Sequence, residues 1–264
     1  MPIYNGERFL RKAIDSVLAQ DFTDFELIIC DDCSTDDSVK IIESYDDPRI
    51  ILHRNDHNYG LAGNWNHSIS FAKGKYIKIM MQDDILCQGA LSKQVSLMEA
   101  HPEASLAVGN TSIINEEDKT IVKRFRYKKE RVINGKRYAK RSLRGRNIFC
   151  EPPNHLFRKA DFDKYGPYDD SLAYCPDWDM CLTLSEIGDI VCTDTEVMRF
   201  RLSSTQTTSK VFSKSEAFVN NDSYQMFIKH MKSGILGLNR FDYFIFWFVI
   251  KINSLAKTLF LLYH

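Results

Sequence analysis

The sequence predicts an α/β protein built on a mostly parallel sheet flanked by helices, and two observations support this. Apolar residues recur at helical and at strand spacing in alternation over residues 1–102, with short connections between the segments. Two of the expected strands are followed by loops that carry paired carboxylates, Asp31-Asp32 and Asp83-Asp84. Because sheets of this kind bind ligands beyond the carboxyl ends of their strands, these loops are the first candidates for a site.

The expected elements follow in order from the N-terminus. Residues 7–20 carry an apolar stripe at helical spacing, which predicts an amphipathic helix. Further helices are expected at 36–45, 61–72 and 89–101, and buried strands at 25–30, 49–53 and 75–81. Each strand is therefore followed by a helix, as parallel pairing with crossover helices requires.

The pattern is less regular after residue 102. Strands are expected at 105–115 and 120–127, paired across the turn between them, and at 154–158. Helices are also expected at 177–187 and 213–232. The apolar run 241–263 is interrupted by Lys251 and Lys257, so it falls short of the roughly 18 uninterrupted apolar residues of a spanning helix.

Composition excludes several classes of protein. Lys plus Arg and Asp plus Glu each number 35 in 264 residues, so the chain lacks the cationic excess of a nucleic-acid-binding protein. Seven cysteines, an odd number, indicate a reducing compartment, and we expect a cytoplasmic protein. Cys30 and Cys33 form an isolated C-x-x-C that lacks a second pair for zinc. The basic segment 123–146 fits a solvated face better than a patch for an anionic ligand or lipid headgroup.

Asp83 and Asp84 lie where a buried strand emerges. Ionised carboxylates there carry a desolvation cost that a divalent cation would offset, and oxygen ligands select Mg²⁺ or Mn²⁺. The alternative is that both residues belong to an ordinary turn or helix cap. No P-loop motif occurs, and no G-x-G-x-x-G follows a strand, which argues against those nucleotide sites.

Several segments in order resemble the family 2 glycosyltransferases over residues 1 to about 90. PIYNG at 2–6 is similar to the P-x-Y-N that ends the family's first strand, and DDCSTDDS at 31–38 matches D-D-x-S-x-D-x-S. Asn58-Tyr59-Gly60, Asn66 and the KGKYI of 73–77 resemble the run that leads into the D-x-D loop. The resemblance implies a GT-A fold with a Rossmann-like sheet.

The resemblance also implies roles for individual residues. Tyr4 would stack near the nucleobase, Asp32 would accept a hydrogen bond from it, and Asp83 would hold Mg²⁺ or Mn²⁺. The residues implied to bind the nucleotide sugar are Pro2, Tyr4, Asn5, Asp32, Ser34, Asn58 and Asp84. Met81 departs from the family pattern, where a carboxylate stands at the first position of the loop.

Pro176-Asp177-Trp178-Asp179 resembles the family's E-D-x-[DE], in which the Asp is the general base. Asp177 is thereby implied to be catalytic, with Pro176 in place of the usual acid. The alternative is an ordinary Asp in the first turn of a helix. Arg199 to Ser203 is similar to the family's R-x-H tail, with Ser203 in place of the His.

The implied activity is transfer of one sugar, with inversion, from a nucleoside-diphosphate sugar to an acceptor hydroxyl. No Q-x-x-R-W of processive synthases occurs. The expected acceptor is a saccharide or lipid-linked saccharide in bacterial surface-polysaccharide assembly, and nucleic acid is not an expected partner. The alternative is a catalytically degenerate module that binds a nucleotide sugar, because Met81, Pro176 and Ser203 all depart from the pattern.

The expected organisation is a catalytic domain at 1–205, with a nucleotide-binding half (1–100) and an acceptor half (101–205). Residues 206–264 would form a helical segment that packs on the domain or lies peripherally on the inner face of the cytoplasmic membrane. Met1 alone precedes Pro2, so the first strand, which is central in the resembled family, is expected to be largely missing. The sequence thus predicts a start at an internal methionine of a longer reading frame and a poorly stable chain.

Overall fold

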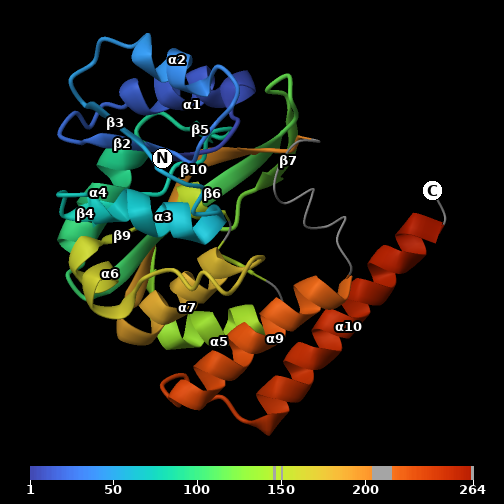
Figure 1. The fold of residues 1–264 in the computed structure, drawn as a ribbon. Coiled ribbons are helices and arrows are strands. Elements are labelled where there is room, and N and C mark those ends of the chain that lie inside the picture. Colours follow the sequence, from blue (N-terminus) through green and yellow to red (C-terminus); the bar gives the residue numbers. More distant parts are fainter. Residues whose placement is uncertain (145–146, 150, 204–215, 263–264) are drawn as a thin grey trace.

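The computed structural model describes residues 1–144, 147–149, 151–203 and 216–262 (Figure 1). The strands are β1 (Pro2–Ile3), β2 (Leu27–Asp31), β3 (Ile50–Arg54), β4 (Tyr76–Ile77), β5 (Ile85–Leu86), β6 (Ala104–Ile114), β7 (Thr120–Arg124), β8 (Arg131–Ile133), β9 (Leu156–Arg158) and β10 (Asp189–Arg201). The helices are α1 (Glu7–Leu18), α2 (Ser38–Glu43), α3 (Leu61–Ser70), α4 (Ala90–Ala100), α5 (Gly135–Leu143), α6 (Lys159–Tyr165), α7 (Pro176–Ile187), α9 (Glu216–Ser233) and α10 (Arg240–Leu262), with a 3-10 turn η1 at Pro152–Asn154.

Parallel pairing dominates the centre of the fold, as the alternating pattern predicts. Strands β1, β2 and β3 form a parallel sheet, and the long strands β6 and β10 pair parallel to each other. The shorter strands β4, β5, β7, β8 and β9 add to β6 and β10 or to one another in antiparallel fashion. The carboxyl ends of β2 and β3 therefore share one edge, where the first carboxylate loop emerges.

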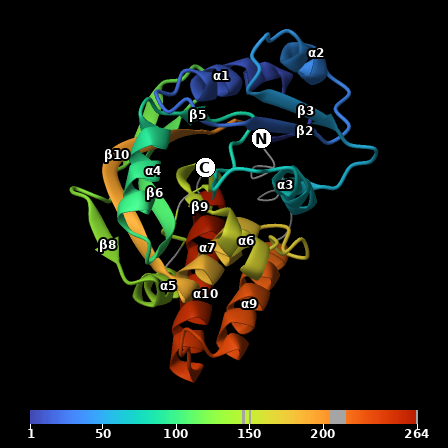
Figure 2. The ribbon, with the colours of Figure 1, turned by 90° about the vertical axis from the view of Figure 1, so that its left-hand side faces the viewer.

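Strand alternation divides the core between the two faces of the larger sheet. Ile190 and Cys192 of β10 pack with side chains of α3, α5 and α7, whereas Val191 packs with α4. A third cluster lies between α1, α2 and the strands β1 and β2. Helices thus cover both faces of the sheets, which confirms the predicted α/β class (Figure 2).

Most elements of the first half match the sequence prediction within a few residues. The strand expected at 75–81 is an exception, because regular pairing there covers Tyr76 and Ile77 alone. The first strand is as short as predicted, but it ends the order β1-β2-β3 rather than lying inside that sheet. Directly after β1, the side-chain amide of Gln82 pairs with the backbone of Tyr4, accepting from Tyr4 N at 2.8 Å and donating to Tyr4 O at 3.1 Å.

Helices α9 and α10 run side by side on the part of the molecule away from α1 and α2 (Figure 1, Figure 2). Phe246 of α10 stacks on Phe227 of α9, with ring centroids 4.6 Å apart. Within the described residues, no helix combines the length and hydropathy needed to cross a bilayer.

A buried ionic network fixes α9 to α7. Lys229 Nζ donates to Asp179 Oδ2 at 2.6 Å, and His230 contacts Asp179 Oδ1 at 3.0 Å and Glu186 Oε1 at 2.8 Å. Both ring nitrogens face carboxylates, so the doubly protonated imidazolium satisfies both. Burial lowers the pKa of His230, but the hydrogen bonds to Asp179 and Glu186 outweigh it and raise that pKa.

We expect His230→Ala to lower the free energy of unfolding by about 3 kcal/mol near pH 6, because it leaves two buried carboxylates without the imidazolium. A raised histidine pKa stabilises the fold fully below the ordinary pKa, and this contribution is lost as pH rises through the folded value. The difference from wild type should therefore shrink toward about pH 9. Urea unfolding at both pH values measures it.

The control is His57→Ala, since His57 pairs with Asp56 on the surface, where the two side chains are 61% and 82% exposed. The free energy of unfolding of the control should be close to that of the wild type at both pH values. An equal loss for His230→Ala at pH 6 and pH 9 would contradict the role of the imidazolium.

Candidate active site

The loop after β1 is tied to the loop after β2 by reciprocal hydrogen bonds. Asn5 N donates to Ser34 Oγ at 2.9 Å, and Thr35 N donates to Asn5 Oδ1 at 2.8 Å. Asn5 adopts a positive φ of 48°, a conformation that asparagine tolerates better than most residues. Tyr4 beside it is 51% exposed, so its ring is available to a ligand. Pro2, in contrast, is buried within β1 and paired with Cys30.

Asp32 organises the third loop of this edge. Its carboxylate is buried and accepts from Asn55 Nδ2 at 2.8 Å, Tyr59 N at 2.8 Å and Gly60 N at 3.0 Å. Asn58 Nδ2 donates to the Asp32 carbonyl at 3.0 Å. The implied nucleotide-binding residues Tyr4, Asn5, Asp32, Ser34 and Asn58 thus lie in one cluster of connected loops. Three of the roughly four acceptor positions of the Asp32 carboxylate are used within the protein.

Asp83 and Asp84 lie close to this cluster, because Gln82 joins their loop to Tyr4. Asp84 is 1% exposed, and its Oδ1 accepts from Arg201 N at 2.9 Å. Burial, and then the neighbouring Asp83 carboxylate, raise the pKa of Asp84 well above its ordinary value, although the Arg201 N–H opposes them. The ionised form of this pair therefore needs a compensating positive charge.

The donor set fits a small divalent cation. Asp84 Oδ2 is buried and has no hydrogen-bond partner in the described part of the chain, as expected of an oxygen that needs a cation. Mg²⁺ binds through one or two carboxylates together with water and substrate phosphates. Among the described residues, no group of three or more His, Cys, Asp or Glu side chains has the arrangement of a metal site.

Asp177 is the second residue of α7, after Pro176, at the helix start that the sequence predicts. Desolvation raises the pKa of Asp177 to about 7; backbone hydrogen bonding at Trp178 opposes the rise, and the charge of Glu151 adds to it. A carboxylate with this pKa changes its protonation state near neutral pH. Such values mark candidate acids and bases.

Glu151 is a site residue that the sequence motifs do not reveal. Its charge raises the pKa of both Asp84 and Asp177, so it lies within electrostatic reach of each. Arg124 forms an ion pair with Oε1 of Glu151. Oε2 of Glu151 is buried and has no hydrogen-bond partner among the described residues. In the sequence, Glu151 is distinguished only by its position directly before Pro152-Pro153, where proline restricts the backbone of the preceding residue.

Arg201 lies in the segment Arg199 to Ser203 that resembles the R-x-H tail, although the resemblance predicts no role for its side chain. Its side chain is fully buried at the end of β10, and its Nε donates to the carbonyl of Asp83 at 2.7 Å. Ser203, which stands in place of the family's His, is also buried. Met81, at the position where the family carries a carboxylate, packs against the core formed by α3, α5 and α7.

Known proteins resemble this chain in sequence and in fold. Residues 1–166 match Glycosyl transferase family 2. The UDP-Glc:alpha-D-GlcNAc-diphosphoundecaprenol beta-1,3-glucosyltransferase WfgD of Escherichia coli is 36% identical over 125 residues, 47% of this chain and 48% of WfgD. This alignment and one with a second curated relative span 48% and 43% of those proteins, so the match covers about half of their length.

Solved structures share the GT-A fold with the chain. S. aureus TarS 1–349 in complex with UDP-GlcNAc has a TM-score of 0.67 at 18% identity, over 79% of this chain and 59% of TarS. The mannosyltransferase PcManGT from Pyrobaculum calidifontis, in complex with GDP-Man and Mn²⁺, has a TM-score of 0.61 at 14% identity, over 88% and 62% of the two chains. The GT-A fold predicted from the motifs is confirmed, and the chain belongs to glycosyltransferase family 2.

Proposed function

We propose that this chain transfers a single sugar from a nucleoside-diphosphate sugar to a hydroxyl of a lipid-linked saccharide, with inversion at the anomeric carbon. The observation that carries the proposal is the position of Asp177 at the start of α7, where the motif comparison expects the base; its pKa, raised by desolvation to about 7, suits that role. The pathway class, bacterial surface-polysaccharide assembly, is supported by WfgD, whose name describes a diphosphoundecaprenol-linked acceptor.

Asp177 would act as the general base. Its carboxylate accepts the proton of the acceptor hydroxyl while that oxygen attacks the anomeric carbon. The bond from this carbon to the diphosphate oxygen breaks on the opposite side, and the electron pair leaves with the nucleoside diphosphate. One displacement without a covalent intermediate inverts the anomeric centre.

The donor would lie over the loops after β1, β2 and β3. Tyr4 offers an exposed ring face to the nucleobase, while Asn5, Ser34 and Asn58 hold the surrounding loops by their hydrogen bonds. Asp83, with the buried oxygen of Asp84, would hold Mg²⁺ or Mn²⁺, which when bound neutralises charge on the departing diphosphate. The Mn²⁺ complex of PcManGT supports this choice of metal.

A nucleotide-sugar-binding module without catalysis is the alternative, because Met81, Pro176 and Ser203 depart from the family pattern. Incubation of the purified chain with UDP- and GDP-sugars and Mn²⁺ separates the two. Binding without transfer to a lipid-linked acceptor and without donor hydrolysis would favour the module.

Asp177→Asn should lower the rate of transfer by roughly 10²–10⁴-fold while donor binding stays within about twofold, because the amide has no comparable proton affinity. In the wild type, the base must be ionised, so transfer should rise with pH through about 7. Asp170→Asn is the matched control, since Asp170 is an exposed carboxylate in the preceding loop. Transfer by Asp177→Asn close to the wild-type rate would remove Asp177 from the mechanism.

Glu151→Gln should shift the acid limb of the pH–rate profile to lower pH, because removing this negative charge lowers the pKa of Asp177. The profile is measured at saturating donor. Glu117→Gln, an exposed change elsewhere in the acceptor half, serves as the control and should leave the limb in place. A shift to higher pH would mean that Glu151 does not act through its charge.

Asp83→Ala should abolish the Mn²⁺ dependence of nucleoside-diphosphate binding, because it removes the carboxylate assigned to the cation. Calorimetric titration of UDP and GDP with and without Mn²⁺ measures this. Asp46→Ala is the control, because Asp46 is exposed and lies between α2 and β3, outside the loops that carry the candidate site. Its Mn²⁺-dependent nucleotide binding should equal that of the wild type. Unchanged Mn²⁺-dependent affinity in Asp83→Ala would show the metal assignment to be wrong.

A further inference from the structure

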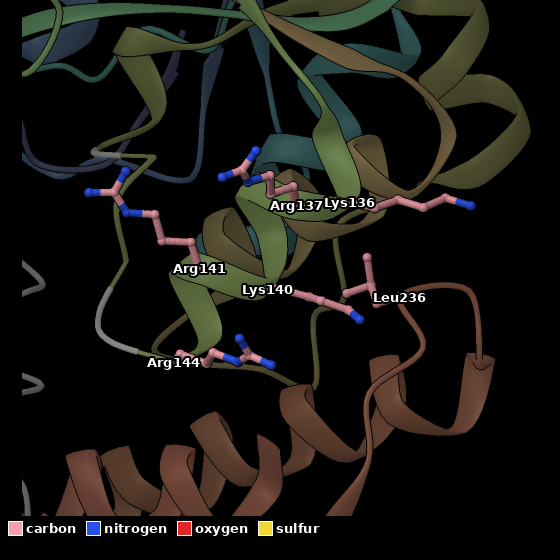
Figure 3. A pocket seen from close by; sticks show the side chains of 6 residues that line it. All are labelled: Lys136, Arg137, Lys140, Arg141, Arg144 and Leu236. Atoms are coloured by element: carbon pink, nitrogen blue, oxygen red, sulfur yellow. The ribbon is translucent and has the colours of Figure 1, made fainter. Parts of the chain in front are cut away.

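Helix α5 presents a basic face that the proposed sugar transfer does not use. The residues lining a pocket of about 500 Å³ between α5 and the α9–α10 connection are Lys136, Arg137, Lys140, Arg141, Arg144 and Leu236 (Figure 3). The opposite face of α5 is buried through Tyr138, Ala139 and Leu143. The helix is therefore anchored by its apolar side, and its cations point outward from a fixed base.

Little of this positive charge is neutralised. Within the described part of the chain, no carboxylate forms an ion pair with Lys136, Arg137, Lys140 or Arg141. Lys140 Nζ donates to the Gly237 carbonyl at 3.2 Å, and this uncharged acceptor does not neutralise the ammonium group. Arg144 alone pairs with an acid, Asp242, at 2.5 Å. Four cations in one pocket thus create a local positive potential that favours an anionic partner.

Helix α10 exposes an apolar stripe beside this pocket. Its members are 39% to 66% exposed and recur at helical spacing: Phe241, Phe244, Trp247, Phe248 and Ile252. The other side of the helix packs on the protein through Tyr243 and Phe246. An exposed patch of large aromatic side chains marks an interaction site.

The basic pocket and the aromatic stripe meet at one point. Asp242, which holds Arg144, directly follows Phe241, the first member of the stripe. Leu236 lines the pocket from the connection between α9 and α10, and the neighbouring Ile235 is exposed. Cations and exposed apolar side chains therefore adjoin around the beginning of α10.

We infer that this combined surface docks the protein on a bilayer containing anionic phospholipids. The aromatic side chains enter the boundary between headgroups and acyl chains, and the α5 cations bind the headgroup phosphates. Charge complementarity selects this occupant over a second copy of the chain, because four like charges at a protein interface would each need an acidic partner. The inference does not depend on the sugar that is transferred.

Flotation of the full chain with vesicles tests the inference. Binding should be strong to vesicles of phosphatidylcholine with phosphatidylglycerol, weak to phosphatidylcholine alone, and reduced by salt. Arg137→Glu/Arg141→Glu should lower the partition coefficient at least ~25-fold, since each cation near an anionic surface contributes about fivefold. Phe244→Ser/Phe248→Ser should also lower it, and this loss should persist at high salt.

Lys128→Glu/Lys129→Glu is the matched control, because both lysines are exposed, belong to the same basic segment and lie outside the pocket. Thermal melts and nucleotide binding check that each variant is folded. Equal binding of wild type and Arg137→Glu/Arg141→Glu to anionic vesicles would overturn the inference. So would self-association through the stripe without flotation, or binding of soluble pyrophosphate at the pocket with no affinity for vesicles.

Discussion

One buried guanidinium, that of Arg201, connects the end of β10 to the loop that carries Asp83. Arg201 donates to the carbonyls of Asp83 and Asn115, pairs with Asp118 at 2.5 Å and lies 4.4 Å from the ring centroid of Phe9. A buried charge is costly unless it is paired, so losing any one of these contacts should destabilise the charge of Arg201. Moving the carboxylate loop would remove an acceptor from Arg201. The site is thereby fixed to β10, the turn after β6 and helix α1 at once.

The same concentration of negative charge has different consequences at two positions. At Asp84, burial and Asp83 make the ionised state costly, which favours a divalent cation. At Asp177, burial and Glu151 raise the pKa to about 7, a value that would suit the proposed base at neutral pH. Glu151 acts on both groups. A single electrostatic field can therefore prepare one carboxylate for a metal and another for a proton.

The sequence predicts the first half of the fold well, because its helices and strands carry complete apolar periods of their own. Strand β10 escaped prediction, since Thr193, Asp194 and Thr195 interrupt its apolar pattern and its partner β6 is remote in the chain. The residues of the candidate site likewise divide into those that belong to local motifs and those that do not. Loop residues such as Asn5 belong to local motifs and could be predicted, and their loops do come together. Glu151 acquires its role through tertiary contacts, which leave no local pattern. Arg201 belongs to a local motif, but its contacts with Asp83 and Asn115 depend on the tertiary fold.

The network of Lys229 and His230 with Asp179 joins the C-terminal helices to α7 through short, buried contacts. Asp177 begins α7, two residues before Asp179. With α10 resting on a bilayer, this connection would hold the carboxylate of Asp177, the proposed base, at a constant height above the lipid surface. The chain would then select an acceptor hydroxyl by its distance from the membrane surface. A lipid-linked chain one sugar too short or too long would present its hydroxyl at the wrong level.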